Sequence, residues 1–351
     1  MSTNPPSSGE LDAARLLLDR LGVTAEQLLS TPGPEVAMPT FDTFIDRASA
    51  AISVGALKVY QPYFKKIRKE WGQRLIDEPT GLEIQRFAEQ ARSQAVVRRN
   101  ARGGRVAGEH MIGAFRCLYR LAVADELIDE NKNPAAKAVK PRRLSNSRRA
   151  LLDHQLMQIN EIAVTTGNDH DLDGLLIRLH VETACRRGGA LSMRRYDLDP
   201  DQCLVRLREK DETERWQPIS PTLMRHLLAH WQQRGDGDPH STGQLLRYRH
   251  GRPISYRRYD HLWKRIGENL PWVTAQQVST HWLRYTTLTW VERAFGYAVA
   301  RAYAGHNNRA DNGSTATYVR AELYEVVLAL TVLTGEPHPL LPVEHAVALT
   351  R

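Results

Sequence analysis

The chain has 351 residues, of which 42% are hydrophobic and 25% charged, and this balance indicates a folded protein with room for two domains. Its 48 Lys and Arg residues outnumber its 40 Asp and Glu residues, and the net charge of +8 favours a polyanionic partner such as nucleic acid. Three widely spaced cysteines exclude a disulfide framework and a cysteine metal site, and no apolar run is long enough to cross a bilayer, so we expect a cytoplasmic protein without a secretory leader and without membrane contact.

The N-terminal residues predict a short extension. Leucines between positions 11 and 21 are spaced for an amphipathic helix that ends at Gly22, and a second short helix is expected at residues 24–29. The Pro/Gly-rich stretch at 31–40 is typical of a linker. We therefore assign residues 1–37 to an N-terminal helical extension and linker.

A first domain is expected at residues 38–140. The apolar periodicity from residue 41 to about residue 138 is helical throughout and predicts four helices. A glycine-containing segment before the fourth helix carries four arginines, and more basic residues follow the domain. Such residues are either a solvated surface or contacts to a DNA backbone. The candidates for DNA contact are Arg98, Arg99, Arg102, Arg105, Lys140, Arg142 and Arg143.

A second domain is expected at residues 151–351, after a polar, basic linker at 141–150. Helical segments lead into two short alternating runs around a polar turn, which predict a β-hairpin, and helices then resume. An apolar helix and a tail close the chain, and they pack either on their own chain or on a neighbouring protomer. The predicted fold class is mainly α with a small antiparallel β-sheet.

Two groups of possible metal ligands have simpler explanations. Asp169, Asp171 and Asp173 begin like a calcium loop, but the position of the required glutamate holds a histidine, so we expect Asp171 or Asp173 to cap a helix. His226 and His230 have a zinc-binding spacing without the glutamate of a metalloprotease helix. We expect these two histidines to be surface or interface residues.

Another set of residues stands out because of its order along the chain. An arginine pair ends an apolar helical segment, where a buried positive charge needs an anion or a carboxylate. A histidine and an arginine three residues apart follow on one helical face, where both can reach one small anion. The ordered set is Arg186, Arg187, Lys210, His281, Arg284, His306 and Tyr318.

At these residues the sequence resembles the tyrosine recombinase, or phage integrase, family. TACRRGGALSMRRYDLD resembles the first arginine box, KDETERWQPIS the lysine hairpin, HWLRYT the His-x-x-Arg box, AGHNN the Gly-His box, and STATYV the nucleophile segment. One such box is weak evidence, but five in order between Thr183 and Tyr318 are specific. Residues 41–138 resemble the core-binding domain of the family.

The resemblance implies a helical, SAM-like core-binding domain followed by a mixed α+β catalytic domain with a C-terminal interaction tail. It implies site-specific cleavage and rejoining of double-stranded DNA through a 3′-phosphotyrosyl intermediate, in a homotetramer that passes through a Holliday junction. No metal or nucleotide cofactor is implied, and a directionality factor is an optional partner. The expected location is the nucleoid, and the expected origin is a bacterium, a phage or another mobile element. The implied catalytic residues are Arg186, Lys210, His281, Arg284, His306 and the nucleophile Tyr318.

The sequence departs from the family pattern in the first arginine box. Arg187 is an alternative to Arg186, because two adjacent arginines allow an alignment with the family motif that is shifted by one residue. Gly189 stands where the family usually has an acidic residue, and Glu182, one helical turn before Arg186, is a candidate replacement. Tyr285 stands where a second histidine is common, which leaves the main roles untouched.

Two other functions remain open at this point. A type IB topoisomerase uses a similar set of residues to nick and reseal one duplex, although the separate core-binding-like domain and the tail favour a recombinase. A DNA-binding regulator that has kept the fold and lost its activity is the alternative from another class.

Overall fold

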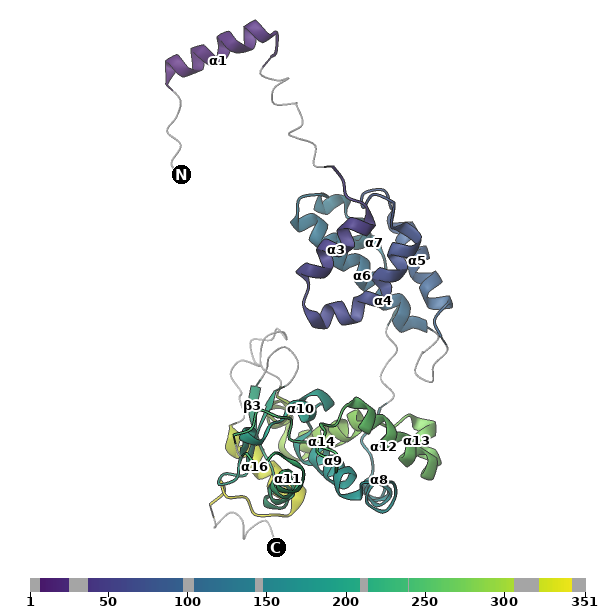
Figure 1. The fold of residues 1–351 in the computed structure, drawn as a ribbon, viewed down its shortest axis with the longest axis vertical. Helices are drawn as coiled ribbons and strands as arrows, with labels where there is room; N and C mark the ends of the chain where they lie inside the picture. The colour runs from purple at the N-terminus through teal and green to yellow at the C-terminus, as the bar shows by residue number, and fades with distance from the viewer. Residues whose placement is uncertain are drawn as a thin grey trace. The chain divides into compact units, whose positions relative to one another are not determined.

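The chain divides into two compact units, Met1–Ser145 and Asn146–Arg351 (Figure 1). The computed structural model describes residues 7–24, 37–96, 104–142, 148–208, 214–238, 240–305 and 322–342. The first described element is α1 (Ser8–Leu21), which has no buried residue. It ends at Gly22, whose left-handed φ of 64° suits a residue without a side chain.

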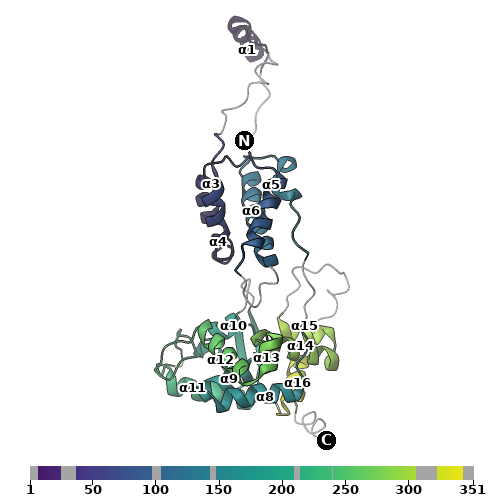
Figure 2. The same ribbon diagram turned by 90° about the vertical axis from the view of Figure 1, so that its right-hand side faces the viewer.

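The first unit is a helical bundle (Figure 2). The N-cap residues before its four longer helices are Thr40, Ser53, Thr80 and Gly104, and the first three cap their helix with a side-chain oxygen. The bundle therefore confirms the predicted helical content of this region. Its elements are α3 (Phe41–Ala51), α4 (Val54–Trp71), α5 (Gly81–Ser93), α6 (Arg105–Ala124), the 3₁₀ turn η2 (Glu130–Lys132) and α7 (Pro134–Lys137).

Aromatic side chains fill the centre of this bundle. Trp71 lies against Phe87 with ring centroids 4.9 Å apart and against Phe115 at 5.3 Å. Phe41 meets Phe115 edge to face at 6.3 Å. Because these rings come from four different helices, their burial fixes the helices of the unit to one another.

The second unit combines helices with one small sheet. The mainly helical fold with a small antiparallel β-sheet confirms the predicted fold class. Its elements are α8 (Asp153–Thr165), α9 (His170–Thr183), α10 (Arg187–Ser192), the 3₁₀ turn η3 (Arg195–Asp197), β1 (Leu198–Asp199), β2 (Leu204–Arg208), β3 (Glu214–Pro218), α11 (Pro221–Arg234), α12 (Tyr256–Asn269), α13 (Pro271–Gln276), α14 (Thr280–Phe295), α15 (Tyr297–Ala304) and α16 (Leu323–Thr334).

The predicted β-hairpin is formed by β2 and β3. The sheet order is β1-β2-β3, with antiparallel pairing throughout. In β2 the side chains of Val205 and Leu207 are buried, and Leu207 pairs across the sheet with Arg215 of β3. The period-two alternation therefore turns Arg215 toward the body of the unit.

Helix α16 packs within its own chain. Its buried residues Val326 and Leu330 join a core with Val291 of α14 and Tyr303 of α15. The sequence left open whether this helix packs on its own chain or on a neighbouring protomer. In the structure it packs into the core of its own chain. The last residues, 343–351, lie outside the described part of the chain.

The acidic residues around position 170 bind arginines. Asp169 accepts two hydrogen bonds from Arg234, at 2.6 and 2.8 Å, and both side chains are buried. Asp169 also caps α9 by accepting a hydrogen bond from Leu172 N at 3.4 Å, so the prediction that Asp171 or Asp173 caps this helix is wrong. The residue nearest the helix start already has the geometry of an N-cap.

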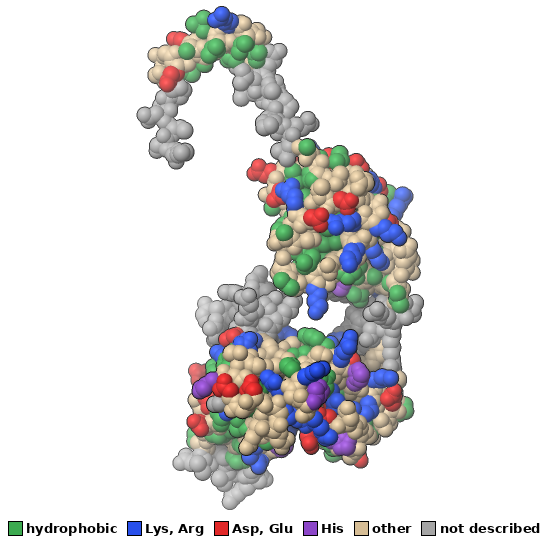
Figure 3. Space-filling view, in the orientation of Figure 1, with side chains coloured by type: hydrophobic (Ala, Val, Ile, Leu, Met, Phe, Trp, Pro, Cys, Tyr) green, Lys and Arg blue, Asp and Glu red, His purple; other side chains and the backbone are tan. Residues whose placement is uncertain are grey.

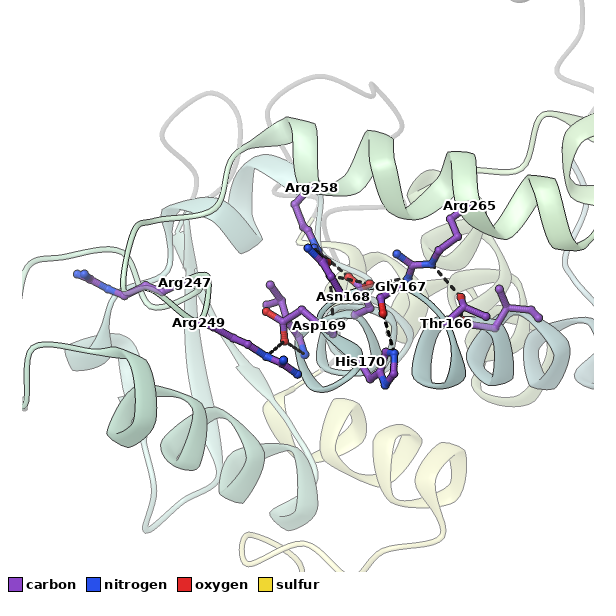
Figure 4. Close-up of polar contacts among 12 residues, drawn as sticks. Thr166, Gly167, Asn168, Asp169, His170, Arg247, Arg249, Arg258 and Arg265 are labelled. Atoms are coloured by element: carbon purple, nitrogen blue, oxygen red, sulfur yellow. Dashed lines mark hydrogen bonds and ion pairs between the residues drawn. The ribbon is translucent and has the colours of Figure 1, made fainter.

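Asp173 lies one turn further along α9 and binds two arginines of α12. Arg258 reaches it at 2.7 Å and Arg265 at 2.5 Å. Figure 4 shows these arginines pointing from α12 toward the start of α9, where Arg258 also bonds Asn168 and Arg265 also bonds Thr166. The cluster joins two helices through a fully buried carboxylate.

We expect Asp173→Asn to lower the free energy of unfolding by about 3 kcal/mol, because it leaves the buried Arg258 charge without its carboxylate. Urea unfolding followed by circular dichroism measures the change. Glu268→Gln is the control, since Glu268 pairs with Lys264 on the solvent side of α12, and its loss changes stability by less than about 0.5 kcal/mol. Equal effects of the two changes would contradict a structural role for the Asp173 cluster.

His230 is buried within its own chain, so the prediction that it is a surface or interface residue is wrong. Its Nε2 accepts a hydrogen bond from Arg247 N at 3.0 Å, which occupies one of the two ring nitrogens that could bind zinc. Within the described residues, no group of three potential ligands is placed to hold a metal ion. Over the same residues, no helix is long and apolar enough to span a membrane.

Burial and the charge of Arg234 lower the pKa of His230 from 6.5 to about 4. Below pH 6.5 the unfolded chain therefore binds a proton that the folded chain does not accept until about pH 4. The free energy of unfolding decreases as the pH is lowered through this window, by up to about 3 kcal/mol. We expect His230→Gln to remove this part of the pH dependence in urea unfolding at pH 7 and pH 5. A constant difference between variant and parent at both pH values would contradict the prediction.

Candidate active site

The turn between α9 and α10 presents Arg186. Only Ala184 and Cys185 separate the end of α9 from Arg186, which is the residue before α10. Ala184 has a left-handed φ of 49°, which is unusual for a residue with a Cβ atom, and it is fully buried. The half-buried Arg186 side chain therefore starts from a fixed turn.

Arg284 holds this turn from α14. Its guanidinium is 4% exposed and donates hydrogen bonds to the backbone oxygens of Ala184 and, at 2.9 Å, of Ala304. Ala304 is the last residue of α15. One guanidinium thus joins the end of α9 to the end of α15 and brings the Arg186 turn beside α14.

His281 lies one turn before Arg284 on α14, with an exposed side chain. Loss of hydration lowers the pKa of its imidazole, and so do three positive charges. Those charges belong to Arg148, Arg284 and Arg186. The structure therefore brings three of the predicted site residues together, and His281 is neutral near pH 7, where it can accept a proton.

Arg148 is a member of this cluster that the sequence prediction missed. Its segment is anchored to α14 by a hydrogen bond from Leu151 N to Thr286 Oγ1 at 2.9 Å. The signal in the sequence was its position in the basic linker, directly before the first apolar residues of the second domain. Composition alone does not show which linker arginine folds back onto a helix.

Arg187 takes a different direction from Arg186. Its guanidinium lies 3.4 Å from Asp260 Oδ1 and 5.3 Å from the ring centre of Tyr256, both on α12. Among the charges that lower the pKa of His281, that of Arg186 is present and that of Arg187 is not. Together with the hydrogen bond from Arg284 to the turn before Arg186, the contacts of Arg187 with α12 favour Arg186 as the arginine of the site.

Glu182 does not replace the missing acid at Gly189, so that expectation is wrong. Its buried carboxylate accepts hydrogen bonds from Arg178 Nε at 2.6 Å and from the Ser220 backbone nitrogen and hydroxyl at 2.9 Å. Burial raises the pKa of Glu182 despite these donors. Helix α9 ends at Thr183, before Arg186, so the helical spacing does not bring the two side chains together, and the carboxylate faces the start of α11 instead.

Arg215 of β3 joins the hairpin to the end of α9. It donates to the backbone oxygen of Thr183 at 3.2 Å. A Cβ atom added to Gly305, which follows α15 with a φ of 67°, would lie 2.4 Å from Arg215 Nη1. The hairpin, α9 and α15 therefore converge around the residues that flank the predicted site.

The sequence profile of the phage integrase family matches residues 149–323. The chain belongs to the phage integrase family. Members of this family of tyrosine recombinases bind DNA and recombine it. No curated protein sequence is similar enough to this chain to count as a match.

Solved integrases share the fold. A lambda integrase tetramer bound to a Holliday junction is 15% identical, with a TM-score of 0.59 over 90% of this chain and 92% of that one. The Tn1549 transposon integrase, in complex with circular intermediate DNA, is 12% identical, with a TM-score of 0.59 over 80% of this chain and 98% of that one. At these identities the likeness concerns the fold.

Three of the predicted catalytic residues of this integrase-family chain lie outside the described residues: Lys210, His306 and Tyr318. In the sequence, Lys210 falls between β2 and β3, His306 directly follows Gly305, and Tyr318 precedes α16. The structure thus describes the elements on either side of each of them. Their roles stay predictions.

The predicted DNA-contact residues divide in the same way. Arg98, Arg99, Arg102 and Arg143 lie outside the described residues. Arg105 was expected in a loop, but it is the half-buried first residue of α6. Lys140 and Arg142 are exposed, and Lys140 lines a groove of about 440 Å³ in the first unit together with the α6 arginines Arg116 and Arg120.

The second unit carries a further basic surface on α12. Arg257, His261 and Lys264 are exposed, and their spacing puts them on one helical face. They line a crevice of about 750 Å³, which Gly167 and Tyr248 also line. Figure 3 shows Lys, Arg and His side chains gathered on one face of this unit. These α12 residues were not among the predicted DNA contacts.

Proposed function

We propose that this chain is a site-specific recombinase that cleaves and rejoins DNA through a 3′-phosphotyrosyl intermediate, with Tyr318 as the nucleophile. The observation that carries the proposal is the convergence at His281. Arg284 donates a hydrogen bond to the backbone oxygen of Ala184, two residues before Arg186, and the charges of both arginines lower the pKa of the His281 imidazole, although the two arginines are almost 100 residues apart in the chain. Such a group is suited to bind one phosphodiester.

The chemistry needs this kind of site. The Tyr318 oxygen attacks phosphorus in line with the departing 5′ oxygen, and negative charge grows on the non-bridging oxygens. Arg186 and Arg284 donate hydrogen bonds to those oxygens, because a guanidinium offers paired donors and keeps its proton. The P–O5′ bond breaks as the tyrosine–phosphorus bond forms.

Two proton movements accompany the exchange of bonds. Free tyrosine has a pKa of about 10, so the hydroxyl of Tyr318 gives up its proton during attack, and the neutral His281 is the acceptor in the described part of the site. Lys210 supplies a proton to the departing 5′ oxygen, and His306 adds a donor to the phosphate. Attack by a 5′ hydroxyl of the partner strand on the phosphotyrosine reverses each step.

Because the phosphotyrosyl bond conserves the energy of the phosphodiester, rejoining needs no nucleotide hydrolysis. We propose that two rounds of exchange take place in a tetramer on two DNA sites, through a Holliday junction. The similar lambda integrase was crystallised as a tetramer on such a junction, which supports the proposal. A directionality factor would decide between integration and excision.

The experiment is to incubate the full-length protein with DNA fragments that flank its own gene and to isolate covalent protein–DNA adducts. Sequencing the trapped fragments maps the cleavage sites. Recurrent adducts at a few positions, joined through the 3′ phosphate, support site-specific recombination. Adducts at scattered positions together with relaxation of supercoiled plasmid would indicate a type IB topoisomerase instead. DNA binding without any adduct would indicate an inactive regulator.

A further inference from the structure

Both carbonyl groups of the Arg186 turn are held by side chains. The oxygen of Ala184 accepts a hydrogen bond from Arg284, which belongs to the candidate site. The oxygen of Cys185, directly before Arg186, lies 3.0 Å from Nδ1 of His180. His180 comes from the last turn of α9 and is 1% exposed.

The hydrogen bonds of His180 define which ring nitrogen carries the hydrogen. A carbonyl oxygen can only accept, so Nδ1 must donate to Cys185, whose sulfur also lies 3.5 Å from this nitrogen. In the neutral ring Nε2 is then an acceptor. It lies 2.9 Å from the hydroxyl of Tyr259, which donates to it. The two rings meet edge to face at 5.3 Å.

Tyr259 is suited to hold this arrangement. It is 1% exposed, and burial raises the pKa of its hydroxyl well above the usual value, so the hydroxyl stays a donor. It comes from α12, whose neighbouring residues Tyr256 and Asp260 contact Arg187. The chain of contacts therefore runs from α12 through His180 to the residue before Arg186.

We infer that His180 and Tyr259 are positioning residues that aim the guanidinium of Arg186 at the phosphate, an inference that rests on the proposed function. Tyr259 keeps the hydrogen of His180 on Nδ1, and Nδ1 fixes the Cys185 carbonyl. Without the Tyr259 hydroxyl, the imidazole loses the hydrogen bond that fixes its position from the α12 side, and Nδ1 no longer holds the Cys185 carbonyl in one place. The turn moves, and Arg186 moves with it.

The test uses the full-length protein and a nicked duplex containing a cleavage site mapped on DNA flanking the gene. Single-turnover cleavage at saturating protein is compared with duplex affinity. We expect Tyr259→Phe and His180→Leu to slow cleavage about tenfold or more, since ångström-scale misplacement of a reacting group has effects of this size. Affinity is expected to stay within about twofold, because the phosphate contacts elsewhere on the duplex are unchanged.

Two further variants separate positioning from folding. His180→Asn places an amide nitrogen where Nδ1 was, so it should restore most of the cleavage rate, and adding Tyr259→Phe to it should cost nothing more. Tyr119→Phe is the matched control, because this buried hydroxyl also donates a hydrogen bond, at 2.8 Å to Ile76 O, but in the first unit. It should leave cleavage unchanged.

The outcomes are distinguishable. If the parent protein forms no adduct that depends on Tyr318, the proposed function fails and this inference fails with it. If the parent cleaves and Tyr259→Phe cleaves at the same rate, only the inference fails. Equal slowing by Tyr119→Phe, or failure of His180→Asn to restore cleavage, would show that the loss reflects general destabilisation and would also overturn it.

Discussion

Tyr318→Phe is expected to abolish the covalent protein–DNA adduct and to leave DNA binding intact. Phenylalanine lacks the oxygen that would attack phosphorus, whereas the arginines that bind the phosphate are unchanged. The measurement uses a nicked suicide substrate, in which cleavage frees a short strand and prevents rejoining. Adduct is detected on a denaturing gel, and binding is measured by mobility shift on an intact duplex.

Tyr324→Phe is the control for this prediction. Tyr324 is the next tyrosine along the chain, lies on α16 and is 38% exposed. The match to the phage integrase family ends at residue 323, which includes Tyr318 and excludes Tyr324. Tyr324→Phe should therefore form the adduct at the parental rate. Loss of the adduct in this variant, with retention in Tyr318→Phe, would assign the nucleophile to α16.

The sequence predicted those parts of the fold whose signals are local. The apolar periodicity between residues 41 and 138 required helices, and the alternating runs around 204–218 required a hairpin. Helix α16 shows what local signals cannot predict. Its apolar face had to be buried somewhere, but only the tertiary structure shows that the partners are α14 and α15 of the same chain.

The candidate site was predicted to a similar extent. The three-residue spacing of His281 and Arg284 placed them on one face, and the structure adds the Arg186 turn to them. Long-range partners could not be predicted, because a charged side chain several carbons long reaches partners on any nearby element. Glu182 binds Ser220, the residue before α11, for this reason, and the charge of Arg148 acts on His281 from the linker.

The largest effect expected in the described part of the site concerns the arginine pair. Arg186→Ala should slow single-turnover cleavage about 100-fold or more, because it removes donors from the charge that develops on the phosphate. Arg187→Ala removes an exposed pair with Asp260, at 3.4 Å, whose contribution to stability is at most about 1 kcal/mol. The two variants are compared on the same nicked duplex with Tyr318 intact.

The comparison is informative because both variants lose one positive charge at neighbouring positions. A general electrostatic effect on DNA affinity would appear in both, and raising the salt concentration would change both alike. Loss of a phosphate ligand would appear only in the variant whose guanidinium belongs to the cluster around His281. If Arg187→Ala alone stops cleavage, the register of the first arginine box is shifted by one residue, and the contacts of Arg187 with α12 would have to rearrange when DNA binds.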